Sequence, residues 1–320
     1  MQVAAQKIVV LGTGGTIAGT AGDASDNIGY TAAQVGVGQL LEAVPGLAKA
    51  AGGALVAEQV AQVDSKDMEH AIWQRLAARC AAHLADPQVR GIVITHGTDT
   101  LEETAWFLRL VLDAHKPVVL TCAMRPATAL APDGPQNLLD AVAVATAAGA
   151  RGVLAVAAGT VHGAGQVRKV HPYRVDAFDS GDGGPLGWVE EGVVRLARDW
   201  PAPQALHPQA GEAGDAARWP RVEIVLSHAA ASGRIVDLLV ADGVDGVVVA
   251  ATGNGTVHQA LEAALLRAQA AGVAVRVTSR CPLGRVLPRP GDALRAEAEG
   301  LGAVKTRVSL LLELLAARRA

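Results

Sequence analysis

Aromatic side chains are scarce in this sequence of 320 residues, where Phe, Trp and Tyr together make up 3%. Half of the residues are nonetheless apolar, so the hydrophobic cores must be built from Ala, Val and Leu. A chain of this length can bury more than one core of this kind. The composition therefore predicts two domains rather than a single small one.

Cysteine is also rare, and Cys80, Cys122 and Cys281 lie far apart in the chain. An odd number excludes a complete disulfide framework, and the spacing fits no metal-binding motif. We therefore expect neither a metal nor another cofactor. The simplest interpretation is a protein of the reducing cytoplasm, with a periplasmic location left open if a leader has been removed.

Neither sign of charge is in large excess: the sequence has 28 Lys and Arg residues and 31 Asp and Glu residues, which gives a net charge of −3. This balance removes the electrostatic case for binding nucleic acid. No apolar run reaches the roughly 18 residues that mark a membrane-spanning helix. The first seven residues lead into a predicted strand without the apolar segment of a signal peptide. We expect a small-molecule ligand, and neither a nucleic acid nor a membrane as partner.

Strand-like and helix-like segments alternate along most of the chain, which is typical of a mostly parallel sheet. In the first 198 residues we predict strands near 7–12, 54–60, 91–95, 117–121 and 152–157 and helices near 31–43, 67–84, 101–113 and 136–147. A glycine-rich stretch, 158–194, predicts a hairpin or loop. In the last 100 residues we predict strands at 221–227, 246–250 and 273–278 and helices near 232–241, 256–270 and 304–318.

The fold class that follows is α/β in both domains. Residues 1–198 form a larger N-terminal domain with a mostly parallel sheet, and 221–320 form a smaller C-terminal domain with a parallel sheet. Between them, residues 199–220 hold four prolines and show no periodicity, which predicts a linker.

The segment 91–101, GIVITHGTDTL, is the first candidate for a site. A β-branched run ends at Gly97, where a sharp turn is possible, and Thr98 and Asp99 follow where a helix begins. Ligands of open α/β sheets bind beyond the carboxyl ends of strands, so chemistry is expected at this turn. Asp99 or Thr100 could equally be a simple helix cap.

A second segment, 7–19, reads KIVVLGTGGTIAG and also ends an apolar run in Gly and Thr. Its glycines can turn backbone N–H groups toward an anion or oxyanion. A nucleotide-binding loop fits poorly, because Ile17 stands where a dinucleotide fingerprint needs Gly and no Gly-Lys-Ser/Thr follows.

The segments TGGTIAG at 13–19 and HGTDTLEETAWFL at 96–108 resemble the two signature segments of the bacterial L-asparaginase family, the threonine amidohydrolases. The similarity continues through 30–45, 64–68, 116–142, 184–192 and 245–257. The resemblance implies a flavodoxin-like N-terminal sheet and hydrolysis of L-asparagine to L-aspartate and ammonia through an acyl-enzyme. It also implies a homotetramer, a dimer of intimate dimers. The alternatives are a mixed glutaminase-asparaginase, a non-catalytic amino-acid-binding protein and a nucleotide-binding enzyme.

The resemblance assigns catalytic roles to five residues. Thr16 matches the attacking hydroxyl, and Tyr30, on a loop that closes over substrate, matches its hydrogen-bond partner. Thr98 and Asp99 form a second set with Lys169, which lies in the matching segment 159–170. The Thr98–Lys169 pair is expected to activate water or to polarise the first step, and Thr98 as the nucleophile is the alternative.

The resemblance also indicates residues that bind the substrate. Ser65 matches the residue that holds the α-carboxylate, and Asp64 and Lys66 flank it, although Ser65 or Asp67 could instead only cap the next helix. Asp99 matches the residue that grips the α-ammonium, and Asn254 a residue that reaches the site from a partner subunit. Gly15 and Thr98 border the reacting group, and the backbone N–H of Thr98 is the expected oxyanion donor.

Two features depart from the family pattern. High-affinity periplasmic members usually carry Gln where Lys66 stands, and a cation there should repel the substrate ammonium unless Asp64 or Asp67 neutralises it. The segment after Arg280 is also shorter than in those members. Three histidines, His96, His162 and His171, are expected to be structural or to face solvent.

Overall fold

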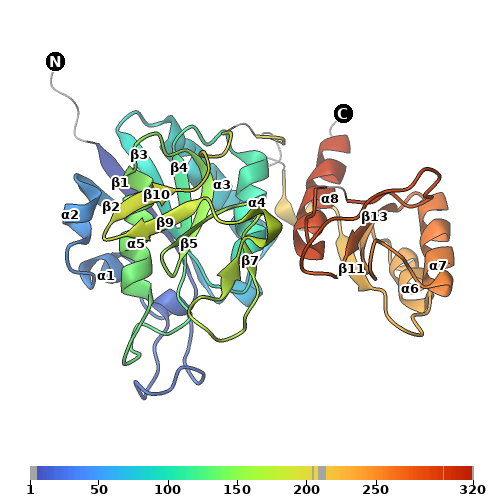
Figure 1. Ribbon diagram of the computed structural model, residues 1–320, viewed down its shortest axis with the longest axis horizontal. Coiled ribbons are helices and arrows are strands. Elements are labelled where there is room, and N and C mark those ends of the chain that lie inside the picture. Colours follow the sequence, from blue (N-terminus) through green and yellow to red (C-terminus); the bar gives the residue numbers. More distant parts are fainter. Residues whose placement is uncertain (1–5, 204, 208–213, 298, 319–320) are drawn as a thin grey trace. The chain divides into compact units, whose positions relative to one another are not determined.

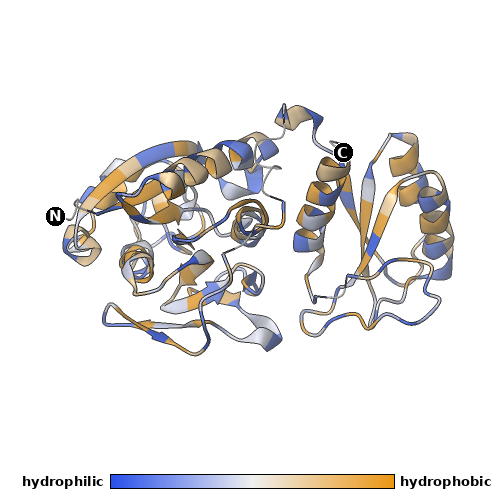
Figure 2. Ribbon diagram, turned by 90° about the horizontal axis from the view of Figure 1, so that it is seen from above, coloured by the Kyte–Doolittle hydropathy of each residue, from blue (hydrophilic) through white to orange (hydrophobic). Residues whose placement is uncertain are grey.

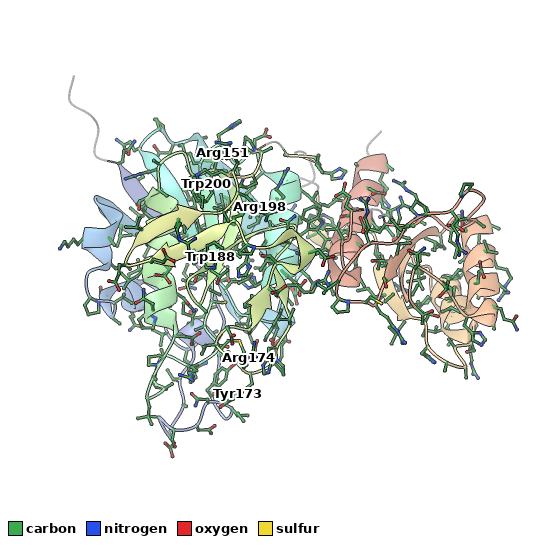
Figure 3. The ribbon with its side chains drawn as sticks, in the orientation of Figure 1. Arg151, Tyr173, Arg174, Trp188, Arg198 and Trp200 are labelled. Atoms are coloured by element: carbon green, nitrogen blue, oxygen red, sulfur yellow. The ribbon has the colours of Figure 1, made fainter. Side chains whose placement is uncertain are left out.

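The computed structural model describes residues 6–203, 205–207, 214–297 and 299–318. The chain divides into two compact units, Met1–Glu212 and Ala213–Ala320. The division falls inside the segment 199–220, of which residues 204 and 208–213 lie outside the described part of the chain. At the start of that segment Trp200 is buried in the core of the N-terminal unit (Figure 3).

The N-terminal unit is built on a sheet of eight strands (Figure 1). Five neighbouring strands are parallel, in the order β2-β1-β3-β4-β5. They are β1 (Lys7–Gly14), β2 (Ala54–Val63), β3 (Val89–Thr95), β4 (Pro117–Thr121) and β5 (Gly152–Ala157). This order is that of flavodoxin-like sheets, in which the direction of winding changes between β1 and β3. The predicted fold class is confirmed.

Three antiparallel strands extend the sheet beyond β5, in the stretch where a hairpin or loop was predicted. They are β6 (Thr160–Gly163), β9 (Gly187–Glu190) and β10 (Val193–Leu196). On β9, the ring of Trp188 (labelled in Figure 3) has its centroid 4.5 Å from the guanidinium carbon of Arg195, a cation–π contact across the β9–β10 pair. A separate two-stranded ribbon joins β7 (Arg168–Lys169) to β8 (Phe178–Asp179).

Helices cover both faces of the large sheet (Figure 1). One layer holds α1 (Val37–Glu42), α2 (Leu47–Ala51) and α5 (Gly134–Thr146), and the other holds α3 (His70–Ala85) and α4 (Leu101–Val111). Successive residues of a strand point to opposite faces, and both Val9 and Val10 are fully buried. The parallel strands therefore read as continuous apolar runs because both of their faces are covered.

The predicted helix at 31–43 is wrong in its first half. Thr31 instead pairs with Thr20 in an antiparallel bridge, through two backbone hydrogen bonds of 2.9 Å, and the helix begins only after Gly36. The bridge closes the base of the loop between these threonines. The short helix α2 was not predicted, because glycines at positions 46 and 52 bound it and leave only five residues.

The C-terminal unit carries a parallel sheet of three strands in the order β11-β12-β13, flanked by three helices, as predicted. The elements are β11 (Val222–Leu226), α6 (Arg234–Ala241), β12 (Gly246–Ala251), α7 (Gln259–Ala270), β13 (Ala274–Ser279) and α8 (Ala303–Ala317). Figure 2 shows helices of both units with apolar and polar stretches, as expected of amphipathic helices that cover a sheet. No helix in the described residues is long and apolar enough to cross a membrane.

Candidate active site

The two sequence motifs meet at the switch point of the large sheet. Strands β1 and β3 are parallel neighbours, with Gly12 paired to Thr95, so both end at the same edge. The Thr13 hydroxyl donates to the carbonyl oxygen of Thr95 at 2.9 Å, which ties the two strand ends together. Open α/β sheets bind ligands at such a point, which makes it the candidate site.

Backbone contact between two glycines brings the turns together. Gly15 has a φ of +82°, and a Cβ there would lie 2.4 Å from the Cα of Gly97. A Cβ on Gly97 would in turn lie 2.4 Å from the Ser65 hydroxyl oxygen. Only glycine permits this approach. The contact therefore sets the spacing between Thr16, which follows Gly15, and Thr98, which follows Gly97.

Thr16 and Tyr30 form the first pair of reactive hydroxyls. Thr16 opens a short 3-10 helix, Thr16–Ala18, and its side chain is 6% exposed. Its Oγ1 lies 2.7 Å from the Tyr30 hydroxyl, a hydrogen bond that either oxygen can donate. Tyr30 sits at the base of the loop closed by the Thr20–Thr31 bridge. The other tyrosine, Tyr173, is exposed on the segment after β7 (Figure 3).

Thr98, Asp99 and Lys169 form the second group. The Lys169 ammonium donates to Thr98 Oγ1 at 2.8 Å and forms an ion pair with Asp99 Oδ1 at 2.6 Å. The Lys169 side chain is 17% exposed and that of Asp99 53%. The ribbon β7 carries Lys169, and its backbone N–H donates to Glu102 of α4 at 3.3 Å. Lys169 therefore reaches the β3 turn from 70 residues further along the chain.

Ser65 is held against the β3 turn rather than at a helix cap. Its hydroxyl accepts the backbone N–H of Asp99 at 3.1 Å, and its carbonyl accepts the Thr100 hydroxyl at 2.7 Å. Asp64 caps the short helix Ser65–Asp67, and α3 begins only after Glu69. The cap interpretations of Ser65, Asp67 and Asp99 are therefore wrong. Thr100 stands at the N-cap of α4, but its side chain makes no cap bond.

Lys66 is neutralised by its two neighbours. Its ammonium lies 3.2 Å from Asp64 and 2.9 Å from Asp67, and its side chain is 62% exposed. Hydrogen bonds to Asp67 and then Asp64 raise the pKa of Lys66 above its usual value. The repulsion expected from an unpaired cation therefore loses its basis, because two carboxylates surround the charge.

A chain of buried hydrogen bonds lies behind the β3 turn, and no pattern in the sequence predicts it. His96 and Thr104 are fully buried. His96 Nδ1 lies 2.7 Å from the carbonyl oxygen of Gly97, and Nε2 lies 2.9 Å from Thr104 Oγ1. The Trp73 indole N–H donates to the same Thr104 oxygen at 2.8 Å. Burial lowers the pKa of His96 to about 4, so the ring is neutral near pH 7.

Asn254 belongs to the C-terminal unit, whereas the residues above belong to the N-terminal unit. It lies in a turn between β12 and α7. Its amide donates to the carbonyl of Leu287 at 3.0 Å and accepts the Leu287 N–H at 2.8 Å. These two bonds fix the side chain within its own unit.

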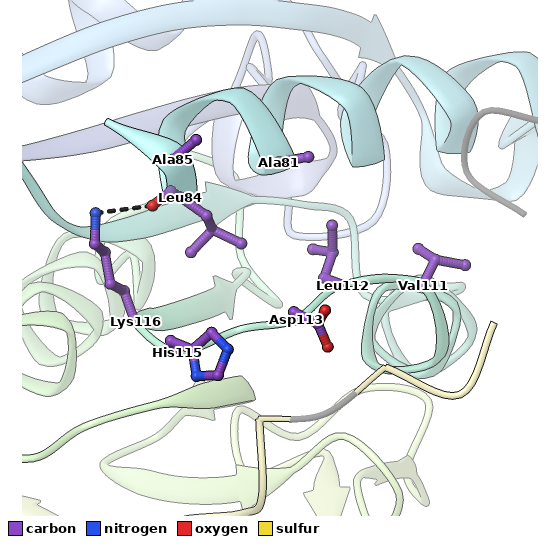
Figure 4. A pocket seen from close by; sticks show the side chains of 8 residues that line it. All are labelled: Ala81, Leu84, Ala85, Val111, Leu112, Asp113, His115 and Lys116. Atoms are coloured by element: carbon purple, nitrogen blue, oxygen red, sulfur yellow. Dashed lines mark hydrogen bonds between the residues drawn. The ribbon is translucent and has the colours of Figure 1, made fainter. Parts of the chain in front are cut away.

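Two other hollows of the N-terminal unit hold none of these residues. One, of about 350 Å³, lies beside the ends of α3 and α4, where Lys116 donates to the Leu84 carbonyl at 2.8 Å (Figure 4). The second, of about 880 Å³, has four acidic residues in its lining, Asp133, Asp140, Glu190 and Glu191. Neither hollow offers a paired hydroxyl nucleophile, so the strand-end site remains the candidate.

Comparison with known proteins finds relatives of both units of the chain. The family model "Asparaginase, N-terminal" matches residues 7–202, and "Glutaminase/Asparaginase C-terminal domain" matches residues 221–316. "L-asparaginase 2" of Escherichia coli (strain K12) is 39% identical over 284 residues, 88% of this chain and 80% of that protein. "Glutaminase-asparaginase" of Pseudomonas fluorescens biotype A is 38% identical over 287 residues, 89% and 78% of the two chains.

A solved structure extends the similarity to three dimensions. The crystal structure named "Probable Cytoplasmic L-asparaginase" from Campylobacter jejuni superimposes with a TM-score of 0.90 at 37% identity. The match covers 97% of this chain and 95% of that one. Both family models, the curated relatives and this structure lead to one conclusion: the chain belongs to the asparaginase family of amidohydrolases.

Proposed function

We propose that this protein is an L-asparaginase that hydrolyses L-asparagine to L-aspartate and ammonia through an acyl-enzyme on Thr16. The observation that carries the proposal is the convergence of two activated hydroxyls at one switch point. Thr16 is paired with Tyr30, and Thr98 with Lys169. A protein that only bound an amino acid would need neither pair.

In the first step, Thr16 Oγ1 attacks the carboxamide carbon of the substrate. The hydroxyl proton leaves through Tyr30, 2.7 Å away, and is passed to the departing nitrogen. The carbon–nitrogen bond breaks, ammonia leaves and an ester forms on Thr16. A threonine hydroxyl is a weak nucleophile without such a partner.

In the second step, water attacks the ester and restores the Thr16 hydroxyl. Thr98 and Lys169 carry the proton transfers, either by activating this water or by polarising the first step, and Asp99 balances the lysine charge. The oxyanion of both tetrahedral intermediates accepts the Thr98 backbone N–H. Within the described residues, this N–H donates to no other protein group.

The substrate is held by its α-substituents. Asp99 is about half exposed, so its carboxylate is open to an α-ammonium, and Ser65 on the adjoining turn takes the α-carboxylate. Asp64, Lys66 and Asp67 adjoin this turn as an ion-paired group, in which the two carboxylates outweigh the lysine charge. Gly15 borders the carboxamide only through its backbone, because its contact with Gly97 leaves no space for a side chain.

Glutamine is the second candidate substrate, supported by the name of the Pseudomonas relative. It differs from asparagine by one methylene, which changes discrimination by only about 1–3 kcal/mol. We propose asparagine as the main substrate and glutamine as a slower one.

Ammonia release from asparagine and from glutamine tests the function directly. The wild type should release ammonia from asparagine, and Thr16→Ala should fall to background while retaining the wild-type melting temperature. Intact mass spectrometry after rapid quenching should find an added aspartyl group on wild type and none on Thr16→Ala. Binding of aspartate without any ammonia release would instead identify a non-catalytic binding protein. Full activity of Thr16→Ala would indicate that Thr98 is the nucleophile.

We also propose a homotetramer built from two intimate dimers, in which Asn254 completes the site of a partner subunit. Light scattering at assay concentration should give four times the chain mass. A fully active monomer would contradict this assembly.

For location we propose the cytoplasm, supported by the name of the Campylobacter protein. Fractionation of the source cells should recover the ammonia-releasing activity with cytoplasmic markers. Recovery with periplasmic markers would contradict the proposal.

A further inference from the structure

The buried chain behind the β3 turn has a fixed direction. A carbonyl oxygen only accepts, so His96 must carry its proton on Nδ1 to bond the Gly97 oxygen, 2.7 Å away. The Trp73 indole N–H only donates, so it occupies a lone pair of Thr104 Oγ1. The Thr104 hydroxyl is then free to donate to Nε2 of the neutral ring. The order is Trp73 to Thr104 to His96 to Gly97.

This chain ends on the peptide unit that the reaction uses. The carbonyl of Gly97 and the N–H of Thr98 belong to the same planar amide. A hydrogen bond to the oxygen of an amide draws electron density from its nitrogen and strengthens the N–H as a donor. It also fixes the plane of the peptide and therefore the direction of the N–H. Preorganised donors of this kind are the main source of oxyanion stabilisation.

We propose that His96 is a positioning residue for the oxyanion site, which orients and polarises the Gly97–Thr98 peptide while Thr104 and Trp73 hold its tautomer. The inference rests on the proposed function, because it assigns a partner to the Thr98 N–H. It gives His96 a role beyond the structural one expected from the sequence.

The surroundings of His96 favour a neutral ring as donor. The side chain is fully buried, and its contacts are a carbonyl and a hydroxyl rather than a carboxylate. A charged imidazolium there would be poorly solvated, consistent with its lowered pKa. The chain therefore works by hydrogen-bond direction and not by proton transfer to the substrate.

Paired substitutions test the role. His96→Leu fills the space without a donor, whereas His96→Asn places an amide N–H near the position of Nδ1. We expect His96→Leu to lower kcat for asparagine by roughly tenfold, the worth of about 1.4 kcal/mol, with KM changed less than about twofold. His96→Asn should recover most of kcat. Thr104→Val should also lower kcat, because without the Thr104 hydroxyl no donor holds the His96 ring in the tautomer that is protonated on Nδ1.

A matched control separates positioning from loss of packing. Phe107 is fully buried and its ring centroid lies 5.0 Å from that of Trp73, but a phenyl side chain carries no hydrogen-bonding N–H or O–H group. Phe107→Leu should lower the melting temperature at least as much as His96→Leu while kcat stays within about twofold of wild type. Nitrogen NMR of the wild type should find His96 protonated on Nδ1.

The outcomes also separate this inference from the proposed function. If wild type releases ammonia and His96→Leu keeps its kcat, or if the ring is protonated on Nε2, the positioning role is overturned and the asparaginase proposal stands. A kcat loss in His96→Asn and Phe107→Leu equal to that in His96→Leu would also overturn it, since packing alone would then account for the effect. If wild type itself releases no ammonia, the proposed function has failed, and the NMR result still tests the hydrogen-bond direction.

Discussion

Replacement of Lys169 by methionine removes the amine that touches both Thr98 and Asp99 and keeps most of the side-chain length. The amine lies 2.8 Å from the Thr98 hydroxyl and 2.6 Å from the Asp99 carboxylate. A positioned acid or base contributes about 10²- to 10⁴-fold to a rate. We therefore expect Lys169→Met to lower kcat for asparagine by about 10³-fold.

The same change should cost little stability. Asp99 is 53% exposed, so water can solvate the carboxylate once its partner is gone. Ion pairs with an exposed member contribute roughly 0–1 kcal/mol. For a chain of this size that corresponds to a shift of only about 2–4 °C in melting temperature. Loss of rate without loss of fold is thus the expected signature, measured by coupled ammonia release and by thermal unfolding.

Two companion variants sharpen the result. Lys169→Arg keeps a positive charge that can pair with Asp99 but does not give up its proton near neutral pH. It should be nearly as slow as Lys169→Met if proton transfer is the role. Arg168→Met changes the adjacent residue of β7, which points to the other side of the ribbon, and should stay close to wild type. Near-normal rates in Lys169→Met would refute the role of the amine. A near-normal rate in Lys169→Arg would indicate that Lys169 contributes only its positive charge and not proton transfer.

Three further predictions concern single groups. Tyr30→Phe removes the hydroxyl that lies 2.7 Å from Thr16 Oγ1, so kcat should fall by about 10²-fold at constant melting temperature. A rate within threefold of wild type would exclude Tyr30 as the proton carrier. Lys66→Gln should change KM for asparagine by less than about threefold, because Asp64 and Asp67 already neutralise the lysine charge. A clear fall in KM would instead support the hypothesis that Lys66 repels the substrate ammonium. The pKa of His96 is lowered to about 4 in the folded protein, so the neutral ring stabilises the fold fully above the unfolded pKa near 6.5. This stabilisation, up to about 3 kcal/mol, is lost as the pH falls toward 4. The unfolding free energy of His96→Leu, measured with denaturant, should therefore depend less on pH than that of wild type, and an equal dependence would argue against the lowered pKa.

Much of the fold could be predicted because buried parallel strands are continuous apolar runs. The strands β4 and β5 were placed residue for residue, since proline or glycine marks where each begins. The helix predicted from residue 31 failed because Thr31 is recruited by a bridge to Thr20. A pairing between residues outside regular strands leaves no periodicity in the sequence.

The site itself was only partly accessible from the residues alone. The two glycine-rich strand ends were visible, and their meeting follows from the order of a doubly wound sheet. Tyr30 and Lys169 came from the family resemblance, because each reaches its threonine from a loop or ribbon that periodicity does not place. Ser65 read equally well as a helix cap, and its bond to the Asp99 N–H removes the cap interpretation. The role of His96 depends on the direction of hydrogen bonds, which a sequence does not contain.

The bridge between Thr20 and Thr31 has a consequence for how much change the loop that it closes can tolerate. Two backbone hydrogen bonds clamp the loop at its base, and Tyr30 lies next to that clamp, whereas Ile28 nearer the tip is 78% exposed. Changes in backbone conformation at the tip of the loop are therefore not expected to move the Tyr30 side chain. The entropic cost of closing a flexible loop grows only slowly with its length, so residues can be inserted or removed at the tip at small cost. Changes in length at the tip are thus expected to leave the geometry of the Thr16–Tyr30 pair unchanged.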